Sequence, residues 1–184
     1  MKNNTKYEYL IKEDGVYITL FQKNGNKHVA IIDKDKLDDF LNYRYSWNIG
    51  FHGGGIKEYY LRATQYLGIV NGKPKYNTIM LHDFVLGFPN WKSIDHINNN
   101  SLDSRVLNLR ESTISTNSRN RYSKNINNKS GYRNVCLIHG WYRIQLQVDG
   151  KNHLFPEKFK NADNAGCFAE EMRLKYYGEF AGKG

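Results

Sequence analysis

The sequence predicts an α+β protein built from short strands, hairpins and a few helices. Residues 16–21 are β-branched and aromatic, which is typical of a strand. Residues 141–148 alternate between apolar and polar side chains, the pattern of a strand with one buried face. Apolar residues between 165 and 176 recur at helical spacing. With 184 residues, the chain can form one domain or two small ones.

The first segment, residues 1–77, is predicted to be rich in β-structure. Strands are expected over residues 16–21, 28–32, 43–47 and 59–63. Asp33 directly follows the second of these strands and is placed to cap a short helix. Leu37 and Phe40 have the spacing of the apolar face of that helix.

The second segment, residues 78–122, is predicted to be a β-hairpin packed on a helix. A short helix over residues 78–86 should end at Gly87, before Phe88 and Pro89. The remaining elements are a strand at 92–96, a polar loop at 98–104, a strand at 108–112 and a helix capped by Thr113 that runs to about residue 122.

This second segment contains a dense group of reactive side chains. Asp95 and His96 are adjacent, and Asn108 and Asn117 follow 13 and 22 positions after the aspartate. An aspartate and a distant carboxamide can hold a hard divalent cation, while the histidine remains able to deprotonate a water molecule. Those are the requirements of a phosphodiester-cleaving site with one metal ion.

Residues 81–120 resemble the HNH endonuclease family, in particular its phage and intron-encoded branch. The resemblance is carried by Leu81-His82-Asp83-Phe84-Val85-Leu86-Gly87, Ile94-Asp95-His96-Ile97-Asn98, Leu102-Asp103-Ser104-Arg105, Asn108-Leu109-Arg110-Glu111-Ser112-Thr113 and Asn117-Ser118-Arg119-Asn120. It implies a ββα-metal core in which His96 is the general base. It also implies that Asp95 and Asn117 hold one Mg²⁺ or Mn²⁺, and that Asn108 braces the loop so that His96 stays aimed.

Three positions depart from the family pattern. Asn117 stands where many members have histidine, although the phage branch commonly has asparagine there. Asn99 replaces a usual loop glycine, and Ser104 replaces a common asparagine.

The two cysteines form no Cys-x-x-Cys pair, so we expect no structural zinc. His82 is interpreted as a packed residue in preference to a metal ligand.

Residues 123–130 are predicted to be a basic linker, and residues 131–184 a DNA-binding domain. Ser130–Val135, Gly140–Lys151 and Lys175–Ala181 resemble the plant ethylene-response-factor (APETALA-type) domain. The resemblance implies a three-stranded antiparallel sheet packed on one helix, with Asp149-Gly150 as a hairpin turn. We expect Ala165, Phe168, Ala169, Met172 and Tyr176 to form the apolar stripe of that helix.

The charge distribution favours an anionic partner. The formal net charge is +9, of which residues 118–184 contribute +6, whereas residues 81–117 carry −1. The candidate DNA-contacting residues are Arg110, Arg119, Asn120, Arg121, Lys124, Lys129, Arg133, Trp141, Arg143, Gln145 and Gln147. Two roles remain open. Arg110 contacts phosphate or pairs with Asp103 or Glu111, and Arg143 reads bases or supports the fold.

Taken together, these patterns predict a metal-dependent DNA endonuclease of the homing type, acting on double-stranded DNA in the cytoplasm of an infected bacterial cell. The first residues lack the apolar core of a signal peptide, and no apolar run has the length of a membrane span. The alternative is a catalytically silent, sequence-specific DNA-binding regulator; RNA as the substrate is a weaker third reading. The sequence decides neither the target site nor the oligomeric state.

Overall fold

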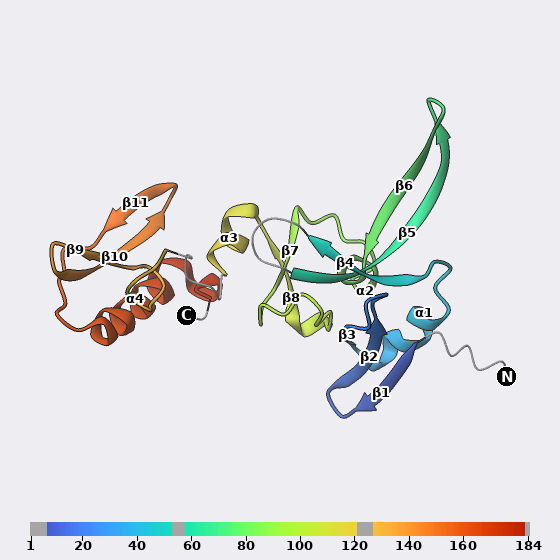
Figure 1. Cartoon of the computed structure of the whole chain (residues 1–184), viewed down its shortest axis with the longest axis horizontal. Helices are drawn as coiled ribbons and strands as arrows, with labels where there is room; N and C mark the ends of the chain where they lie inside the picture. The colour runs from blue at the N-terminus through green and yellow to red at the C-terminus, as the bar shows by residue number, and fades with distance from the viewer. Residues whose placement is uncertain (1–6, 53–57, 121–126, 183–184) are drawn as a thin grey trace. The chain divides into compact units, whose positions relative to one another are not determined.

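A computed structural model describes residues 7–52, 58–120 and 127–182 (Figure 1). The fold is α+β, and strands within its three-stranded sheets pair antiparallel. The chain divides into two compact units, residues 1–111 and 112–184, and each has its own hydrophobic core. The division therefore falls inside the segment 78–122 that the sequence suggests as one nuclease core.

The first sheet of the N-terminal unit has the strand order β1-β2-β3. Its strands are β1 (Glu8–Lys12), β2 (Gly15–Phe21) and β3 (Lys27–Ile32), which confirms the two strands predicted here. Every second side chain of β2 is buried, because alternate residues of a strand face one side of the sheet. The 3₁₀ turn η1 (Lys34–Lys36) and the helix α1 (Leu37–Leu41) follow.

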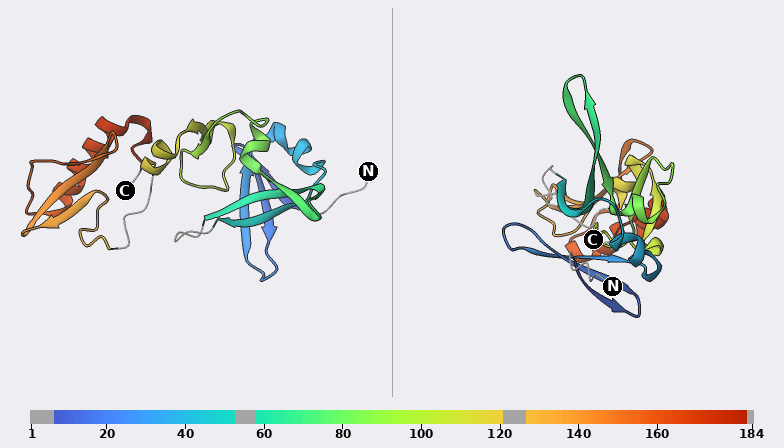
Figure 2. Two further views of the ribbon diagram at one scale, coloured as in Figure 1. Left: turned by 90° about the horizontal axis from the view of Figure 1, so that it is seen from above. Right: turned by 90° about the vertical axis from the view of Figure 1, so that its right-hand side faces the viewer.

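The second sheet has the order β4-β5-β6, formed by β4 (Trp47–His52), β5 (Glu58–Val70) and β6 (Lys73–Met80). The predicted strand over residues 43–47 is wrong except at its last residue. The Tyr43 ring instead packs on Trp47 and Phe84, at centroid distances of 4.9 and 4.7 Å. The outer part of the β5–β6 ribbon extends away from the rest of the unit (Figures 1 and 2).

The helix predicted from residue 78 starts three residues later, as α2 (Leu81–Val85). Thr78 belongs to β6, where it pairs with Thr64, so sheet pairing prevails over the local helical pattern. The predicted end is confirmed, because Gly87 adopts φ +72°, a conformation that favours glycine. The predicted Asp33 cap is wrong: its side chain caps no helix and accepts a hydrogen bond from the Val106 amide, 2.7 Å away.

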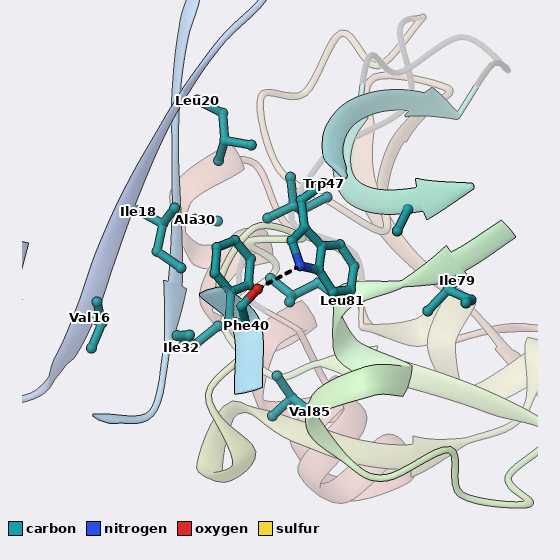
Figure 3. Packing of buried hydrophobic residues seen from close by; sticks show 12 residues of the cluster. Val16, Ile18, Leu20, Ala30, Ile32, Phe40, Trp47, Ile79, Leu81 and Val85 are labelled. Atoms are coloured by element: carbon teal, nitrogen blue, oxygen red, sulfur yellow. Dashed lines mark hydrogen bonds between the residues drawn. The ribbon is translucent and has the colours of Figure 1, made fainter. Parts of the chain in front are cut away.

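The core of the N-terminal unit forms where the first sheet, α1, β4 and α2 meet (Figure 3). Phe40 stacks on Trp47 with ring centroids 5.5 Å apart, and the indole Nε1 donates to the Phe40 carbonyl at 3.3 Å. Burying a large apolar side chain contributes about 1.5–3 kcal/mol, so this cluster anchors the elements that lead into the candidate site.

The predicted hairpin is present as the two-stranded sheet of β7 (Ser93–His96) and β8 (Leu109–Ser112), with the 3₁₀ turn η2 (Val106–Asn108) before β8. The helix α3 (Ile114–Arg119) follows. Thr113 caps α3 as predicted, because its hydroxyl accepts from the Thr116 amide and the Thr116 hydroxyl accepts from the Thr113 amide.

The C-terminal unit contains a sheet of order β11-β10-β9 and a long helix that lies along one face of it (Figures 1 and 2). Its elements are β9 (Val135–Ile138), β10 (Trp141–Val148), β11 (Lys151–Leu154), α4 (Ala162–Tyr177) and η3 (Gly178–Phe180). Asp149 and Gly150 both have positive φ, which confirms the hairpin turn.

The apolar stripe of α4 is confirmed with one correction. Tyr177 is buried against the sheet, whereas the predicted Tyr176 is 39% exposed. Tyr177 takes the buried position in place of Tyr176 because its hydroxyl bridges the backbone of Gln147. It accepts from the Gln147 amide at 3.1 Å and donates to the Gln147 carbonyl at 3.0 Å. Among the described helices, none combines the length and apolar character needed to cross a membrane.

Candidate active site

Asp95 and His96 are the last two residues of β7, and both are buried, with 3% and 8% of their surface exposed. Buried polar residues of this kind need partners, and polar residues concentrated in one place are typical of functional sites. The hydrogen bond from the Ile97 amide to the Asn108 carbonyl, 2.9 Å long, joins the chain after His96 to the start of β8. Asp95 and His96 therefore lie at the end of a strand, where the loop between β7 and β8 begins.

Arg110 on β8 pairs with Asp95. Its Nε and Nη2 lie 2.8 and 2.7 Å from the same carboxylate oxygen, Oδ2. The sequence left open whether Arg110 contacts phosphate or pairs with Asp103 or Glu111; the structure gives it a different acidic partner. A charge-assisted pair of this kind, largely shielded from water, fixes the orientation of the Asp95 carboxylate.

His96 lies among other rings. The His82 ring on α2 packs edge-on against it at a centroid distance of 5.2 Å, and the Tyr60 ring on β5 lies 6.3 Å away. Burial, followed by the charge of His82, lowers the pKa of His96 to about 3, although Asp103 opposes the shift. Burial also lowers the pKa of His82. His96 is therefore a neutral imidazole near pH 7, the form that can accept a proton.

The loop between β7 and β8 is held by a network of amide side chains. Asn108 Nδ2 donates to the Asp103 carbonyl at 2.7 Å and to Asn98 Oδ1 at 3.0 Å, while its Oδ1 accepts from the Asn98 amide at 3.0 Å. Asn98 Nδ2 also donates to Asp103 Oδ2 at 2.8 Å. Asn99 adopts φ +60°, which is a glycine-like conformation at the position where the resemblance leads one to expect glycine.

A set of contacts that the sequence did not predict fastens this loop to the first sheet. Arg105 donates to both oxygens of Asp103, at 2.8 and 2.7 Å, and its Nη1 donates to Asp14 Oδ2 at 2.8 Å. Ser104, only 1% exposed, donates from its amide to the Ile31 carbonyl on β3. An acid next to a loop arginine was a visible signal, but Asp14 lies 91 residues earlier and only folding brings the two together.

Asn117 lies on α3, in the C-terminal unit, and its side chain is exposed. Asn117 therefore belongs to a different unit from Asp95 and His96. Asn120, a candidate DNA contact, directly follows α3 and is 5% exposed. Among the described residues, no group of three or more histidines, cysteines and acids could hold a metal ion.

Seven of the other candidate DNA contacts fall into three sets. Arg121 and Lys124 lie outside the described residues. Arg119, Lys129, Gln145 and Gln147 line a groove of about 840 Å³ on the C-terminal unit. Arg133 also borders this groove, but it is 8% exposed and its guanidinium donates to backbone carbonyls.

The strand β10 presents the expected alternation. Ile144 and Leu146 are buried, whereas Gln145 and Gln147 are exposed on the opposite face. Arg143 lies on the face of the glutamines but is half-buried, and its Nη2 donates to the Phe155 carbonyl at 2.6 Å. Trp141 is covered by the Lys160 ammonium, 3.7 Å from the ring centroid. The glutamines are therefore the most accessible polar side chains of this strand.

Comparison with protein-family models, with curated proteins and with solved structures finds no match to this chain.

Proposed function

We propose that this protein is a metal-dependent DNA endonuclease that hydrolyses phosphodiester bonds at a recognised duplex site. One observation carries the proposal. Asp95 and His96 are buried at the end of β7, and Asn108 binds the loop that follows them at both of its ends. A binding protein has no need of a buried neutral imidazole beside a carboxylate, whereas hydrolysis needs a base next to an anion that can hold a cation.

In this proposal, His96 accepts a proton from the attacking water. Its low pKa would make it a weak base by itself, but a substrate phosphate drawn close to the ring would raise that pKa towards neutrality. The edge-on contact with His82 limits rotation of the His96 ring. Asn108 holds the loop in place, so the His96 imidazole keeps its orientation towards the attacking water.

Asp95 and Asn117 would hold one Mg²⁺ or Mn²⁺. Carboxylate and carboxamide oxygens are ligands that such hard cations accept, and Mg²⁺ commonly uses one or two protein carboxylates with several waters. When bound, the ion supplies charge stabilisation for the phosphate and for the leaving oxygen. Arg110, already beside Asp95, orients the carboxylate and can contact the phosphate when Asp95 is engaged elsewhere.

DNA contacts would come mainly from the C-terminal unit, where the basic and amide side chains of the groove gather. We place the protein in the cytoplasm of a phage-infected bacterium, as a homing-type enzyme that nicks DNA or cuts both strands. Lysine and arginine neutralise phosphates, while exposed glutamines can pair with adenine edges in the major groove.

One observation favours the second candidate, a catalytically silent DNA-binding regulator. The Asp95 carboxylate is already paired with the Arg110 guanidinium, which neutralises the charge that a metal ion would need. Such a protein would bind duplex DNA with the same C-terminal surface but would leave it intact.

Incubation of the full chain with supercoiled plasmid, with Mg²⁺ and with EDTA, distinguishes the two functions. We expect relaxed or linear plasmid only with Mg²⁺ or Mn²⁺, and none with His96→Ala. Intact plasmid with every divalent metal, combined with tight binding in a gel-shift assay, would identify the silent regulator instead.

A further inference from the structure

Arg133 joins three parts of the C-terminal unit that are far apart in sequence. It lies in the turn before β9 and is 8% exposed. Its Nη1 donates to the Ala181 carbonyl, after η3, at 3.2 Å, and its Nη2 makes a short hydrogen bond to the Arg119 carbonyl at the end of α3. The same residue thus touches a helix that precedes it and the last described turn of the chain.

Other contacts reinforce this junction. The Arg119 guanidinium lies over the Tyr177 ring, 5.0 Å from its centroid, and α3 also contacts η3. Arg173, 1% exposed on α4, donates to the Arg133 carbonyl at 3.2 Å and so holds the turn in place. Tyr177 is itself hydrogen-bonded to Gln147 on β10, the strand that presents the exposed glutamines. The contacts run without a break from β10 to α3.

These contacts attach α3 to the C-terminal unit. A helix of six residues is not stable in water by itself, because the cost of its first turn is not recovered over so few residues. Its last carbonyls lack partners inside the helix, and a cation there is favourable because it meets the negative end of the helix dipole. Arg133 supplies both the donor and the charge to the C-terminal end of α3.

We propose that Arg133 is a positioning residue that fixes α3, and with it Asn117, to the C-terminal module, defined as β9–β11 with α4. The sequence offers Arg133 as a DNA contact, whereas its buried guanidinium is directed at two backbone carbonyls. The inference rests on the proposed function, in which Asn117 is a metal ligand. It follows that the module proposed to bind DNA also holds Asn117. DNA binding would then position this metal ligand.

Three variants of the full chain test this role. Arg133→Met removes both hydrogen bonds but keeps an apolar stem, and Arg133→Lys keeps one cation that can reach one carbonyl. Asn134→Gly is the matched control, because Asn134 is the next residue, also binds a backbone carbonyl (Gln145, 3.0 Å) and has φ +64°, which glycine adopts readily. None of the hydrogen bonds that Asn134 makes in the structure reaches α3.

The first readout is amide hydrogen exchange of residues 113–120, which needs no activity. We expect about tenfold or faster exchange of α3 in Arg133→Met, an intermediate rate in Arg133→Lys and no change in Asn134→Gly, with β10 and α4 protected in all three. Unchanged α3 exchange in Arg133→Met would overturn the anchor. Loss of protection throughout the unit in that variant would show a general folding role instead, and would also overturn it.

The second readout is plasmid cleavage as a function of Mg²⁺, together with duplex affinity measured in Ca²⁺. Arg133→Met should cleave at least about tenfold more slowly or need more Mg²⁺, while its DNA affinity stays within about threefold. A large fall in affinity, with a salt dependence weakened by about one phosphate contact, would identify a DNA contact and refute the proposal. If the wild-type chain does not cleave, the proposed function fails and the link to Asn117 fails with it, but the exchange data still decide the anchor.

Discussion

Arg110 Nε donates a hydrogen bond to Asp95 Oδ2 at 2.8 Å, and its Nη2 lies 2.7 Å from the same oxygen in an ion pair; the two side chains are 12% and 3% exposed. Asp95, the residue proposed to bind a metal cation, is therefore already paired with a cationic side chain. If Asp95 binds a divalent ion, that ion must share the carboxylate with the guanidinium or displace the guanidinium.

Arg110→Met should destabilise the N-terminal unit by about 3–5 kcal/mol, because it leaves a buried carboxylate without its cation. If Asp95 binds metal, Mg²⁺ should restore part of that loss by taking the vacated position. Urea unfolding with and without Mg²⁺ measures both effects. Glu111→Gln, at an exposed neighbour, serves as the control. Equal responses of Arg110→Met and the wild type to Mg²⁺ would argue against Asp95 as a ligand.

His96→Ala should reduce the rate of cleavage by about 10²–10⁴, the usual contribution of a general base, while leaving DNA affinity within a few-fold of the wild type. Single-turnover cleavage and fluorescence anisotropy in Ca²⁺ measure the two quantities. His139→Asn removes an exposed histidine of the other unit and should change neither. Near wild-type cleavage by His96→Ala would eliminate His96 as the base.

Asn117→Ala should shift the Mg²⁺ dependence of cleavage to higher concentration, because it deletes one oxygen from a small set of ligands. The exposed position on α3 makes a loss of folding a poor explanation, since alanine is the better helix former. Ser118→Ala, at the next exposed position, is the matched control. A metal titration identical to that of the wild type would remove Asn117 from the proposed ligand set.

Arg105→Met should cost about 3 kcal/mol of stability, because Asp103 is 1% exposed and loses the guanidinium that binds both of its oxygens. Asp14→Ala removes only the exposed end of the same set of contacts and should cost little. Chemical denaturation of the two variants compares them directly. A larger effect of Asp14→Ala than of Arg105→Met would contradict this account of the loop.

Gln145→Ala should relax sequence preference by about 1–3 kcal/mol at one base pair without changing stability, because the side chain is exposed on β10. Arg143→Ala should lower stability by about 1–2 kcal/mol, because it removes the hydrogen bond to the Phe155 carbonyl. Binding selection on a randomised duplex library, together with thermal unfolding, separates the two. Unchanged preference in Gln145→Ala would contradict base reading at that position.

Features that depend on neighbouring residues were predictable from the sequence. The strand at 16–21, the Thr113 cap and the turn at Asp149-Gly150 are present as expected. The strand follows from its β-branched and aromatic residues, the cap from a threonine at the start of a helix, and the turn from the backbone preference of Asp-Gly. None of them requires a contact with a distant part of the chain.

Several local predictions failed where distant segments compete. Thr78 pairs in β6 instead of starting a helix, because β5 offers it a partner. Asp33 binds the Val106 amide instead of capping a helix, because folding brings an unsatisfied donor within reach. Tyr177 takes the buried position expected for Tyr176, since its hydroxyl finds both backbone groups of Gln147. In each case a long-range partner outweighs a weak local preference.

The sequence by itself determined several of the strands and helices, the basic character of the chain and the residues available for chemistry around Asp95 and His96. Only the tertiary structure decided their partners: Arg110 for Asp95, His82 for His96, and two backbone carbonyls for Arg133. The physical reason is that hydrogen bonds and ion pairs depend on distance in space. A charged side chain has many possible partners along a chain. When it is buried it loses its hydration, and it must then pair with a group close enough in space to offset that cost.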